Sequence, residues 1–335
     1  MGIILDLCCK RRKRSYEIER NIFGLLNLGN NCFMNSSLQC ILNSKKLIEK
    51  LINIHLLNDK NLKLSNEISI LLNNVKKGEK SYNPKNIKAI LAEVEEKYKY
   101  IEQNDANEFI TLFLNQLLKE LNGIFQNEYT TGKIPRNDLE LQAFNKLENR
   151  FFLKNKSFLL NLFYGRLKRE YLCQNGHLCS IKFNNFNTLI LPHPEDSNEL
   201  VDLLNLYQKD KLINDTIFCN ECQKEMKYSI KTSIYSIPEY FILCLEKESI
   251  YSSSGLNYPK ILDAKDFTNN NNDRYSLYSF IVYFGDRERG HYTAKCDKIN
   301  NWYYISDNSY KIIDPKDLPK EINDRNAIIL FYEKI

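Results

Sequence analysis

The chain has 335 residues, of which 43% are hydrophobic and 12% aromatic, and its net charge is +5. A chain of this length and composition can bury roughly 75% of its unfolded surface, which excludes an intrinsically disordered protein. The charge is uneven, because residues 1–14 carry +4 and residues 15–335 carry only +1. Nucleic-acid-binding proteins usually spread their basic excess over a folded face, so we expect no nucleic acid partner.

The ten cysteines are too sparse for a disulfide scaffold in a chain of this length, and no secretory signal peptide precedes them. This pattern favours a reducing compartment, in which clustered Cys and His indicate catalysis or metal binding. No stretch approaches the roughly 20 apolar residues that span a bilayer. We therefore expect a cytoplasmic or nuclear protein without a membrane-spanning helix.

The N-terminal tail combines features of a lipid anchor. Gly2 follows the first Met, Cys8 and Cys9 lie close by, and residues 10–14 are all basic. This combination resembles a dual signal, with myristate on Gly2, palmitate on the cysteines and the basic run on anionic lipid. Asp6, however, stands where good myristoylation requires Ser or Thr. The alternatives to peripheral membrane contact are a nuclear localisation signal and a solvated tail.

This tail is assigned to residues 1–20, and the folded part is expected to occupy residues 21–335. Apolar residues at three- and four-residue steps predict two helices, and residues 60–100 also have a helical pattern. The first helix would place Cys32 in its first turn, and the second would start after Asp105. The apolar positions are Met34, Leu38, Ile41 and Leu42 in the first helix, and Phe109, Ile110, Phe113, Leu117 and Leu121 in the second.

Past residue 160 the sequence changes to short runs rich in Tyr, Phe, Ile and Val, which are typical of β-strands. A helical first half followed by a strand-rich second half indicates an α+β architecture. The predicted strands are Leu162–Tyr171, Asn187–Leu191, Lys227–Ile237, Tyr240–Leu245, Tyr278–Phe284, His291–Cys296, Trp302–Ile305 and Ala327–Tyr332.

The segment Gly24–Asn35, with the sequence GLLNLGNNCFMN, brings Cys32 to a helix start after a turn rich in Gly and Asn. Unpaired backbone N–H groups and the positive end of the helix dipole favour thiolate over thiol at such a position, as a nucleophile requires. The alternative is that Cys32 is a small buried hydrophobic residue, as most free cysteines are.

A candidate base for this thiol is His291, which opens a predicted strand directly after a polar loop flanked by Gly285 and Gly290. A histidine at a strand end, held by a third polar group, can reach and activate a thiol at the mouth of a groove. Taken alone, His291 could equally be an exposed loop histidine.

Three separated blocks carry a family resemblance. Residues 24–39 read GLLNLGNNCFMNSSLQ, residues 103–109 read QNDANEF, and residues 290–294 read GHYTA. These blocks resemble, in order and character, those of the ubiquitin-specific protease family of deubiquitinating cysteine peptidases, across roughly residues 22–333. The chain departs from the family pattern at Asn31, where Thr is usual.

The resemblance implies a papain-like α+β fold with a helical thumb at about residues 22–150, a β-rich fingers insertion at about 160–235 and a palm formed by the remainder. It also implies a thiol-dependent deubiquitinase that hydrolyses the isopeptide or peptide bond after the C-terminal Gly of ubiquitin, with no cofactor in the chemistry. Ubiquitin and ubiquitinated proteins would be its partners. The alternatives are a catalytically weak or dead ubiquitin-binding scaffold and a protease for another ubiquitin-like modifier.

By the same resemblance, Cys32 is the nucleophile, His291 is its general base, and the side-chain amide of Asn27 helps to hold the oxyanion. An Asx turn before the helix is the alternative role for Asn27. The family usually orients its histidine with the first of two consecutive Asp or Asn residues, but this chain has Ser306 and Asp307 there. Because Ser306 is neutral and therefore a weaker partner, we expect Asp307 to complete the triad.

Two acidic residues of the second block, Asp105 and Glu108, have two compatible roles. Asp-x-x-Glu before an apolar helical run is a capping-box pattern, in which Asp105 bonds the first turn and Glu108 reaches back. In the family, the matching residues also contact the basic C-terminal tail of ubiquitin, which makes both residues candidates for substrate binding.

A separate set of four residues has the spacing of a metal site: Cys173 and His177, then Cys219 and Cys222. Four nitrogen and sulfur ligands suit a tetrahedral structural zinc with no position left open for catalysis. The family often has two Cys-x-x-Cys pairs in its fingers, and here a Gly takes the place of the second Cys. His177 or Cys179 could replace that ligand, and the alternative is a site that has lost its metal.

Overall fold

The computed structural model describes residues 22–124, 129–131, 133–192, 194, 197–246, 256–268, 272–286, 289–298, 301–322 and 324–335. The tail with Gly2, Cys8 and Cys9 lies outside these residues, so its role stays a prediction. Within the described part of the chain, no helix is long and apolar enough to cross a membrane.

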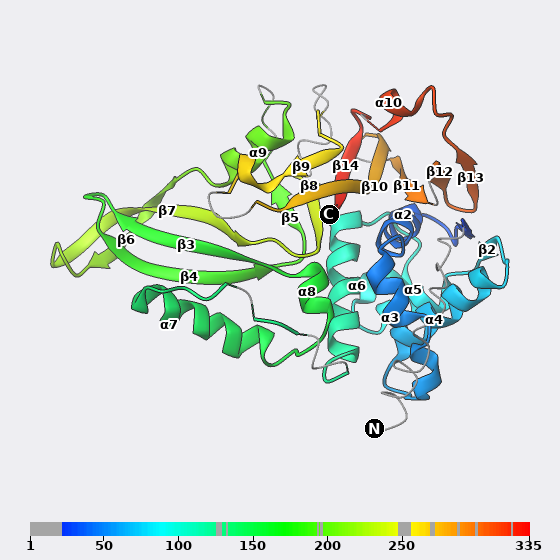
Figure 1. Ribbon diagram of the computed structural model, residues 1–335, viewed down its shortest axis with the longest axis horizontal. Helices are drawn as coiled ribbons and strands as arrows, with labels where there is room; N and C mark the ends of the chain where they lie inside the picture. Colours follow the sequence, from blue (N-terminus) through cyan, green and yellow to red (C-terminus); the bar gives the residue numbers. More distant parts are fainter. Residues whose placement is uncertain are drawn as a thin grey trace.

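The N-terminal part is helical, as the sequence predicts (Figure 1). The second predicted helix begins at Ala106 because the Asp105 carboxylate accepts hydrogen bonds from the backbone N–H groups of Asn107 and Glu108, at 2.7 and 3.1 Å. The helices are α2 (Cys32–Ile41), α3 (Lys45–Leu51), α4 (Lys63–Lys76), α5 (Lys85–Ala92), α6 (Ala106–Glu120), α7 (Asp138–Leu147) and α8 (Leu159–Phe163).

The C-terminal part is built on an eight-stranded sheet with the order β13-β12-β11-β10-β14-β8-β5, to which β9 adds by pairing with β10. Short helices α9 (Leu200–Tyr207) and α10 (Leu318–Glu321) accompany it. The strands are β5 (Leu189–Leu191), β8 (Tyr240–Leu245), β9 (Ile261–Asp263), β10 (Arg274–Gly285), β11 (Gly290–Lys298), β12 (Asn301–Ser306), β13 (Ser309–Ile312) and β14 (Ala327–Lys334).

A second, four-stranded sheet extends to one side of the molecule with α7 along it (Figure 1). Its order is β4-β3-β7-β6, and the strands are β3 (Gly165–Cys173), β4 (Leu178–Phe186), β6 (Lys211–Cys219) and β7 (Lys224–Ser236). A two-stranded parallel pair, β1 (Gly24–Leu25) with β2 (Ser81–Tyr82), lies in the helical part.

Strand prediction was incomplete in the four-stranded sheet. The predicted strand Leu162–Tyr171 was wrong at its start, because that start is the end of α8 and β3 begins only at Gly165. Strands β4 and β6 were missed altogether. Most of their side chains are exposed or half-buried, so their sequences lack the apolar runs that mark a buried strand.

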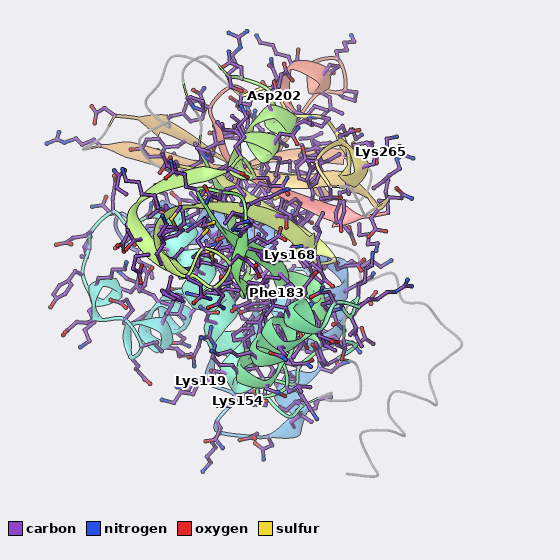
Figure 2. The ribbon with its side chains drawn as sticks, turned by 90° about the vertical axis from the view of Figure 1, so that its left-hand side faces the viewer. Lys119, Lys154, Lys168, Phe183, Asp202 and Lys265 are labelled. Carbon is purple, nitrogen blue, oxygen red and sulfur yellow. The ribbon has the colours of Figure 1, made fainter. Side chains whose placement is uncertain are left out.

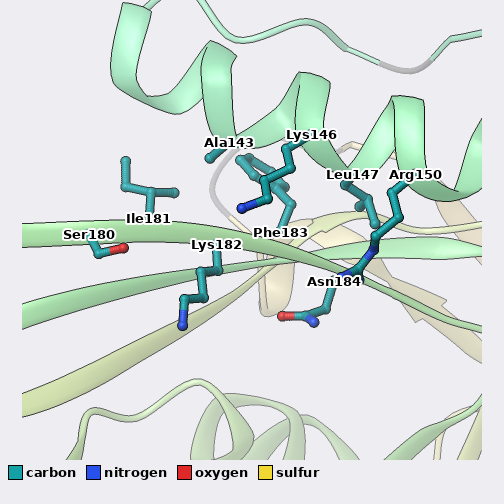
Figure 3. Close-up of a pocket in the computed structure, with 9 residues that line it drawn as sticks. All are labelled: Ala143, Lys146, Leu147, Arg150, Ser180, Ile181, Lys182, Phe183 and Asn184. Atoms are coloured by element: carbon teal, nitrogen blue, oxygen red, sulfur yellow. The ribbon is translucent and has the colours of Figure 1, made fainter.

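Helix α7 packs on the edge strand β4 of this sheet. The ring of Phe144 meets the ring of Phe183 edge to face, with their centroids 5.5 Å apart. Figure 3 shows Ile181 and Phe183 directed towards the helix and Lys182 directed away from it. The helix and strand together border a cavity of about 340 Å³. In the side view of Figure 2, Phe183 lies below Asp202 and above Lys119.

Helix α2 lies between the other helices and the large sheet (Figure 1). All ten of its residues are buried, and it packs against both β11 and α6. The helix that begins with Cys32 is therefore held on one side by the strand that carries His291 and on the other by the helix that follows Asp105.

Candidate active site

Cys32 is the first residue of α2, and only 3% of its surface is exposed. The turn before it passes through the left-handed region at Gly29 (φ +96°) and Asn30 (φ +51°), conformations that Gly and Asn adopt at little cost. The Asn31 side chain closes this turn by accepting a 2.6 Å hydrogen bond from the backbone N–H of Leu28. The Gly- and Asn-rich segment therefore folds as the sequence predicts.

The surroundings of the Cys32 thiol act on its pKa in opposite directions. Burial raises the pKa, and the nearby carboxylate of Asp307 raises it further. Hydrogen bonds from the backbone of Tyr292 and Phe33 lower the pKa, but they do not offset the effect of burial. The loss of hydration therefore outweighs the backbone N–H groups at the helix start, and the pKa of the Cys32 thiol lies above its ordinary value.

His291 lies near the start of β11, opposite Phe284 of β10. Its Nε2 atom is 2.8 Å from the hydroxyl oxygen of Ser306, at the end of β12. The residue after His291 is Tyr292, whose backbone hydrogen-bonds the Cys32 thiol. The structure therefore places His291, with Ser306 as its partner, next to the residue of β11 whose backbone contacts Cys32.

Asp307 is turned away from this histidine. Its two carboxylate oxygens accept hydrogen bonds from the side-chain amides of Asn27, at 2.8 Å, and Asn35, at 2.7 Å. Its backbone is in the left-handed region (φ +49°), and its carbonyl accepts a 2.9 Å bond from the N–H of Leu25. The geometry therefore differs from the expectation that Asp307 orients the histidine: among the described residues, Ser306 is the side-chain partner of His291.

Two roles for the Asn27 amide were considered from the sequence, an oxyanion donor and a member of an Asx turn. Its carbonyl oxygen accepts a 2.9 Å bond from the N–H of Gly29, which is an Asx turn, while its NH₂ group is held by Asp307.

Asn35 is a further site residue that the sequence analysis missed. It links Asp307 to Asn31, whose amide lies 3.3 Å from the Asn35 carbonyl oxygen. The only available signal was its place in the MNS segment of the first block.

The acidic residues of the second block line a cavity of about 210 Å³ beside the site. Asp105 and Glu108 form its helical side, and Tyr292 is one of the residues on its sheet side. Asp105 caps α6, as predicted, but Glu108 does not complete a capping box. Its carboxylate instead pairs with the Lys97 ammonium at 2.5 Å, at a well exposed position.

The predicted metal-binding residues meet at the far end of the four-stranded sheet. The ligand atoms of Cys173, His177, Cys219 and Cys222 all lie within 4.8 Å of one another. The Nδ1 atom of His177 is 3.3 Å from the sulfur of Cys222 and 3.8 Å from that of Cys219. Three thiols and one imidazole in such a cluster fit a structural zinc, which takes four soft ligands in a closed site. The four side chains could therefore hold a metal ion.

We expect the purified protein to contain about one zinc per chain, and Cys219→Ser to lose it and to lower the temperature of unfolding. The matched control is Cys179→Ser. Cys179 lies beside the cluster, with its sulfur 3.6 Å from the His177 carbonyl, but it is not one of the four residues. Metal analysis by mass spectrometry would check this. Absence of zinc from the wild-type protein, or its loss in Cys179→Ser, would contradict the ligand set.

One protein family and several known proteins resemble this chain. The sequence model of the family described as ubiquitin carboxyl-terminal hydrolase matches residues 23–332. Ubiquitin carboxyl-terminal hydrolase 2 of Homo sapiens is 27% identical over 94% of this chain and 55% of its own length. Probable ubiquitin carboxyl-terminal hydrolase 4 of Schizosaccharomyces pombe is 28% identical over 96% of this chain and 60% of its own. The chain thus spans little more than half the length of these relatives.

Solved structures agree on the fold. The SAGA DUB module bound to monoubiquitin, which holds a Ubp8 variant, contains a chain that superimposes with a TM-score of 0.73 at 19% identity, covering 100% of this chain and 74% of that one. The yeast SAGA DUB module with a mutant Sgf73 gives a TM-score of 0.72 at 21% identity, with coverages of 98% and 72%. The α+β, papain-like fold predicted from the sequence is confirmed. With its family pattern matched from residue 23 to residue 332, the chain belongs to the ubiquitin carboxyl-terminal hydrolase family.

Proposed function

We propose that the protein is a thiol-dependent deubiquitinase that hydrolyses the isopeptide or peptide bond after the C-terminal Gly of ubiquitin. The observation that carries this proposal is the placement of Cys32 at a helix start, beside the strand segment formed by His291 and Tyr292, in a member of this family. Nucleophilic catalysis by cysteine requires a base that can reach the thiol, and a histidine adjacent to the strand residue that contacts the thiol can serve as that base.

In the proposed reaction, the Cys32 sulfur gives its proton to His291 and attacks the carbonyl carbon of the terminal Gly. The oxyanion then forms near the start of α2, where the backbone N–H groups and the Asn27 amide can donate to it. His291 protonates the leaving amine, the C–N bond breaks and a thioester remains. His291 next takes a proton from water, whose oxygen attacks the thioester carbon. The C–S bond breaks, the proton passes from His291 to the Cys32 sulfur, and ubiquitin leaves with a free carboxylate.

The neighbours of these groups have supporting roles in this proposal. Ser306 holds the His291 ring through Nε2, and Asp307 holds the Asn27 amide, so the ring and the amide are oriented before substrate arrives. Because Asp307 already accepts from Asn27, the carboxylate fixes where the amide lies rather than serving as the histidine's partner. In this proposal Ser306, rather than Asp307, is the partner of His291, in contrast to the Cys-His-Asp triad expected from the sequence.

The proposed partner is ubiquitin, whose basic C-terminal tail would lie along the cavity beside the site. Asp105 and Glu108 line that cavity and supply negative charge to it. The helices up to about residue 150 would form the thumb, the four-stranded sheet at about 160–235 the fingers, and the remainder the palm. On this proposal the tail of ubiquitin runs between α6 and the large sheet towards Cys32.

The test is a ubiquitin probe with a thiol-reactive group at its C-terminus. The wild-type protein should form a covalent adduct that mass spectrometry maps to Cys32, and Cys32→Ala should form none. A folded wild-type protein that binds ubiquitin without forming an adduct would favour the scaffold alternative. An adduct with a probe built on another ubiquitin-like modifier, but not on ubiquitin, would favour the second alternative.

A further inference from the structure

One edge of β11 is open at the point where the site lies. Strand β12 pairs with β11 from Lys298 back to Ala294, whose partner is Ile305, and the described pairing goes no further. The first residues of β11, from Gly290 to Thr293, therefore pair with β10 on one side, while none of the described strands lies beside them on the other. In a strand, residues two apart direct their N–H and C=O groups to the same side.

Two side chains from the helical part occupy this open edge. The Nε2 atom of Gln103 donates a 2.6 Å hydrogen bond to the carbonyl oxygen of Gly290, and the Cys32 thiol meets the backbone of Tyr292. Gln103 stands two residues before Asp105, whose carboxylate caps α6, so the donor is attached to a fixed helix start. Gln103 thus bridges α6 and the strand segment that contains His291.

Gly290 is also packed against the ring of Tyr283. A Cβ atom at this position would lie 2.1 Å from the phenol group of Tyr283, so only Gly fits against this ring. The Tyr283 hydroxyl in turn donates a 2.7 Å bond to the carbonyl of Asp286, in the loop that leads to β11. The Gly290 peptide is therefore packed on one side by the Tyr283 ring and anchored on its carbonyl by Gln103.

We propose that Gln103 is a positioning residue for the reaction: its amide holds the start of β11, and with it His291 and the N–H of Tyr292, in place at Cys32. Gln103 acts through the Gly290 carbonyl and touches none of the reacting atoms. The inference rests on the proposed function only for the turnover measurement below, and a second measurement needs no ubiquitin.

Two substitutions test this role. Gln103→Ala removes the amide, and Gln103→Glu keeps the size of the side chain but replaces the donor with a carboxylate that repels the Gly290 carbonyl. Both should lower kcat for cleavage of a fluorogenic ubiquitin amide about five- to tenfold, as expected for one lost hydrogen bond. The affinity of the Cys32→Ala protein for ubiquitin should stay within about twofold when either change is added, because binding groups are untouched.

The second measurement is the pH dependence of Cys32 alkylation by iodoacetamide, followed by peptide mass spectrometry. The backbone hydrogen bond from Tyr292 lowers the pKa of the Cys32 thiol. If the first residues of β11 move away from Cys32, this bond weakens and the pKa of the thiol should rise. We expect the midpoint of the alkylation profile to rise by about half a pH unit in both variants, which lowers the rate at neutral pH about threefold.

The matched control is Asn104→Ala, which removes a neighbouring amide whose bond, to the Glu102 carbonyl at 3.1 Å, is local to its own loop. It should leave kcat and the alkylation profile unchanged, and the thermal unfolding midpoints of all three variants should stay within about 2–4 °C of the wild type. A wild-type alkylation profile in both Gln103 variants would overturn the inference, whether or not the protein cleaves ubiquitin. So would a loss of ubiquitin affinity with kcat unchanged, because Gln103 would then be a substrate contact.

Discussion

Asp307→Ala is expected to lower kcat for ubiquitin cleavage by about 10²- to 10³-fold, the cost of losing one oxyanion donor. The carboxylate holds the Asn27 amide at 2.8 Å and the Asn35 amide at 2.7 Å. Without it the Asn27 NH₂ group loses its acceptor and only the Asx-turn bond from Gly29 holds the amide, so in the proposed mechanism the amide donates less well where negative charge develops. Substrate affinity should change little, since none of these groups binds the tail of ubiquitin in the proposed mechanism.

Ser306→Ala is the matched comparison, because it alters the adjacent side chain of the same turn. It removes one neutral hydrogen bond to the His291 ring, for which a loss of about tenfold or less is expected. Steady-state kinetics on a fluorogenic ubiquitin substrate would compare the two variants at equal protein stability. A larger loss in Ser306→Ala than in Asp307→Ala would contradict the assignment of the carboxylate to Asn27.

Some features of this site could be predicted from the sequence, whereas the orientation of Asp307 could not. Helix α2, its start at Cys32 and the cap at Asp105 follow from local rules of spacing and side-chain chemistry, and the structure has them as expected. The orientation of Asp307 depends on its left-handed backbone and on the contact of its turn with β1. That contact joins residues about 280 positions apart, so no local pattern in the sequence could indicate it.

The direction of the Cys32 pKa also depends on segments that are distant in the sequence. A helix start favours the thiolate through groups that are adjacent in the sequence. Burial acts in the opposite direction, and it comes from β11 and α6, which pack around α2 only in the folded chain. The residue types could therefore indicate Cys32 as a candidate nucleophile, whereas the direction of its pKa required the tertiary structure. The same limit applies to Asn35 and Gln103, whose partners lie on distant segments.

The largest effect on stability is expected at the buried ion pair that joins the four-stranded sheet to the helical part. Arg166, on β3, donates from Nε to the Glu148 carboxylate at 2.7 Å, and both side chains are almost fully buried, 6% and 4% exposed. The guanidinium also lies 3.8 Å from the centre of the Phe152 ring, and it bonds the Tyr129 hydroxyl at 2.9 Å. Tyr129 in turn donates to Glu148 at 2.6 Å, so three polar groups satisfy one another inside the core.

Arg166→Met should lower the free energy of unfolding by about 3–5 kcal/mol, because it leaves the Glu148 carboxylate buried without its cation. Adding Glu148→Leu should recover much of this loss, since removing both charges also removes the cost of burying them. The control is Glu93→Ala, which breaks the exposed Lys63–Glu93 pair and should cost less than about 1 kcal/mol. Urea denaturation would measure all three. A loss in Arg166→Met no larger than that in Glu93→Ala would mean that the aromatic rings and Tyr129, rather than the buried ion pair, join the sheet to the helices.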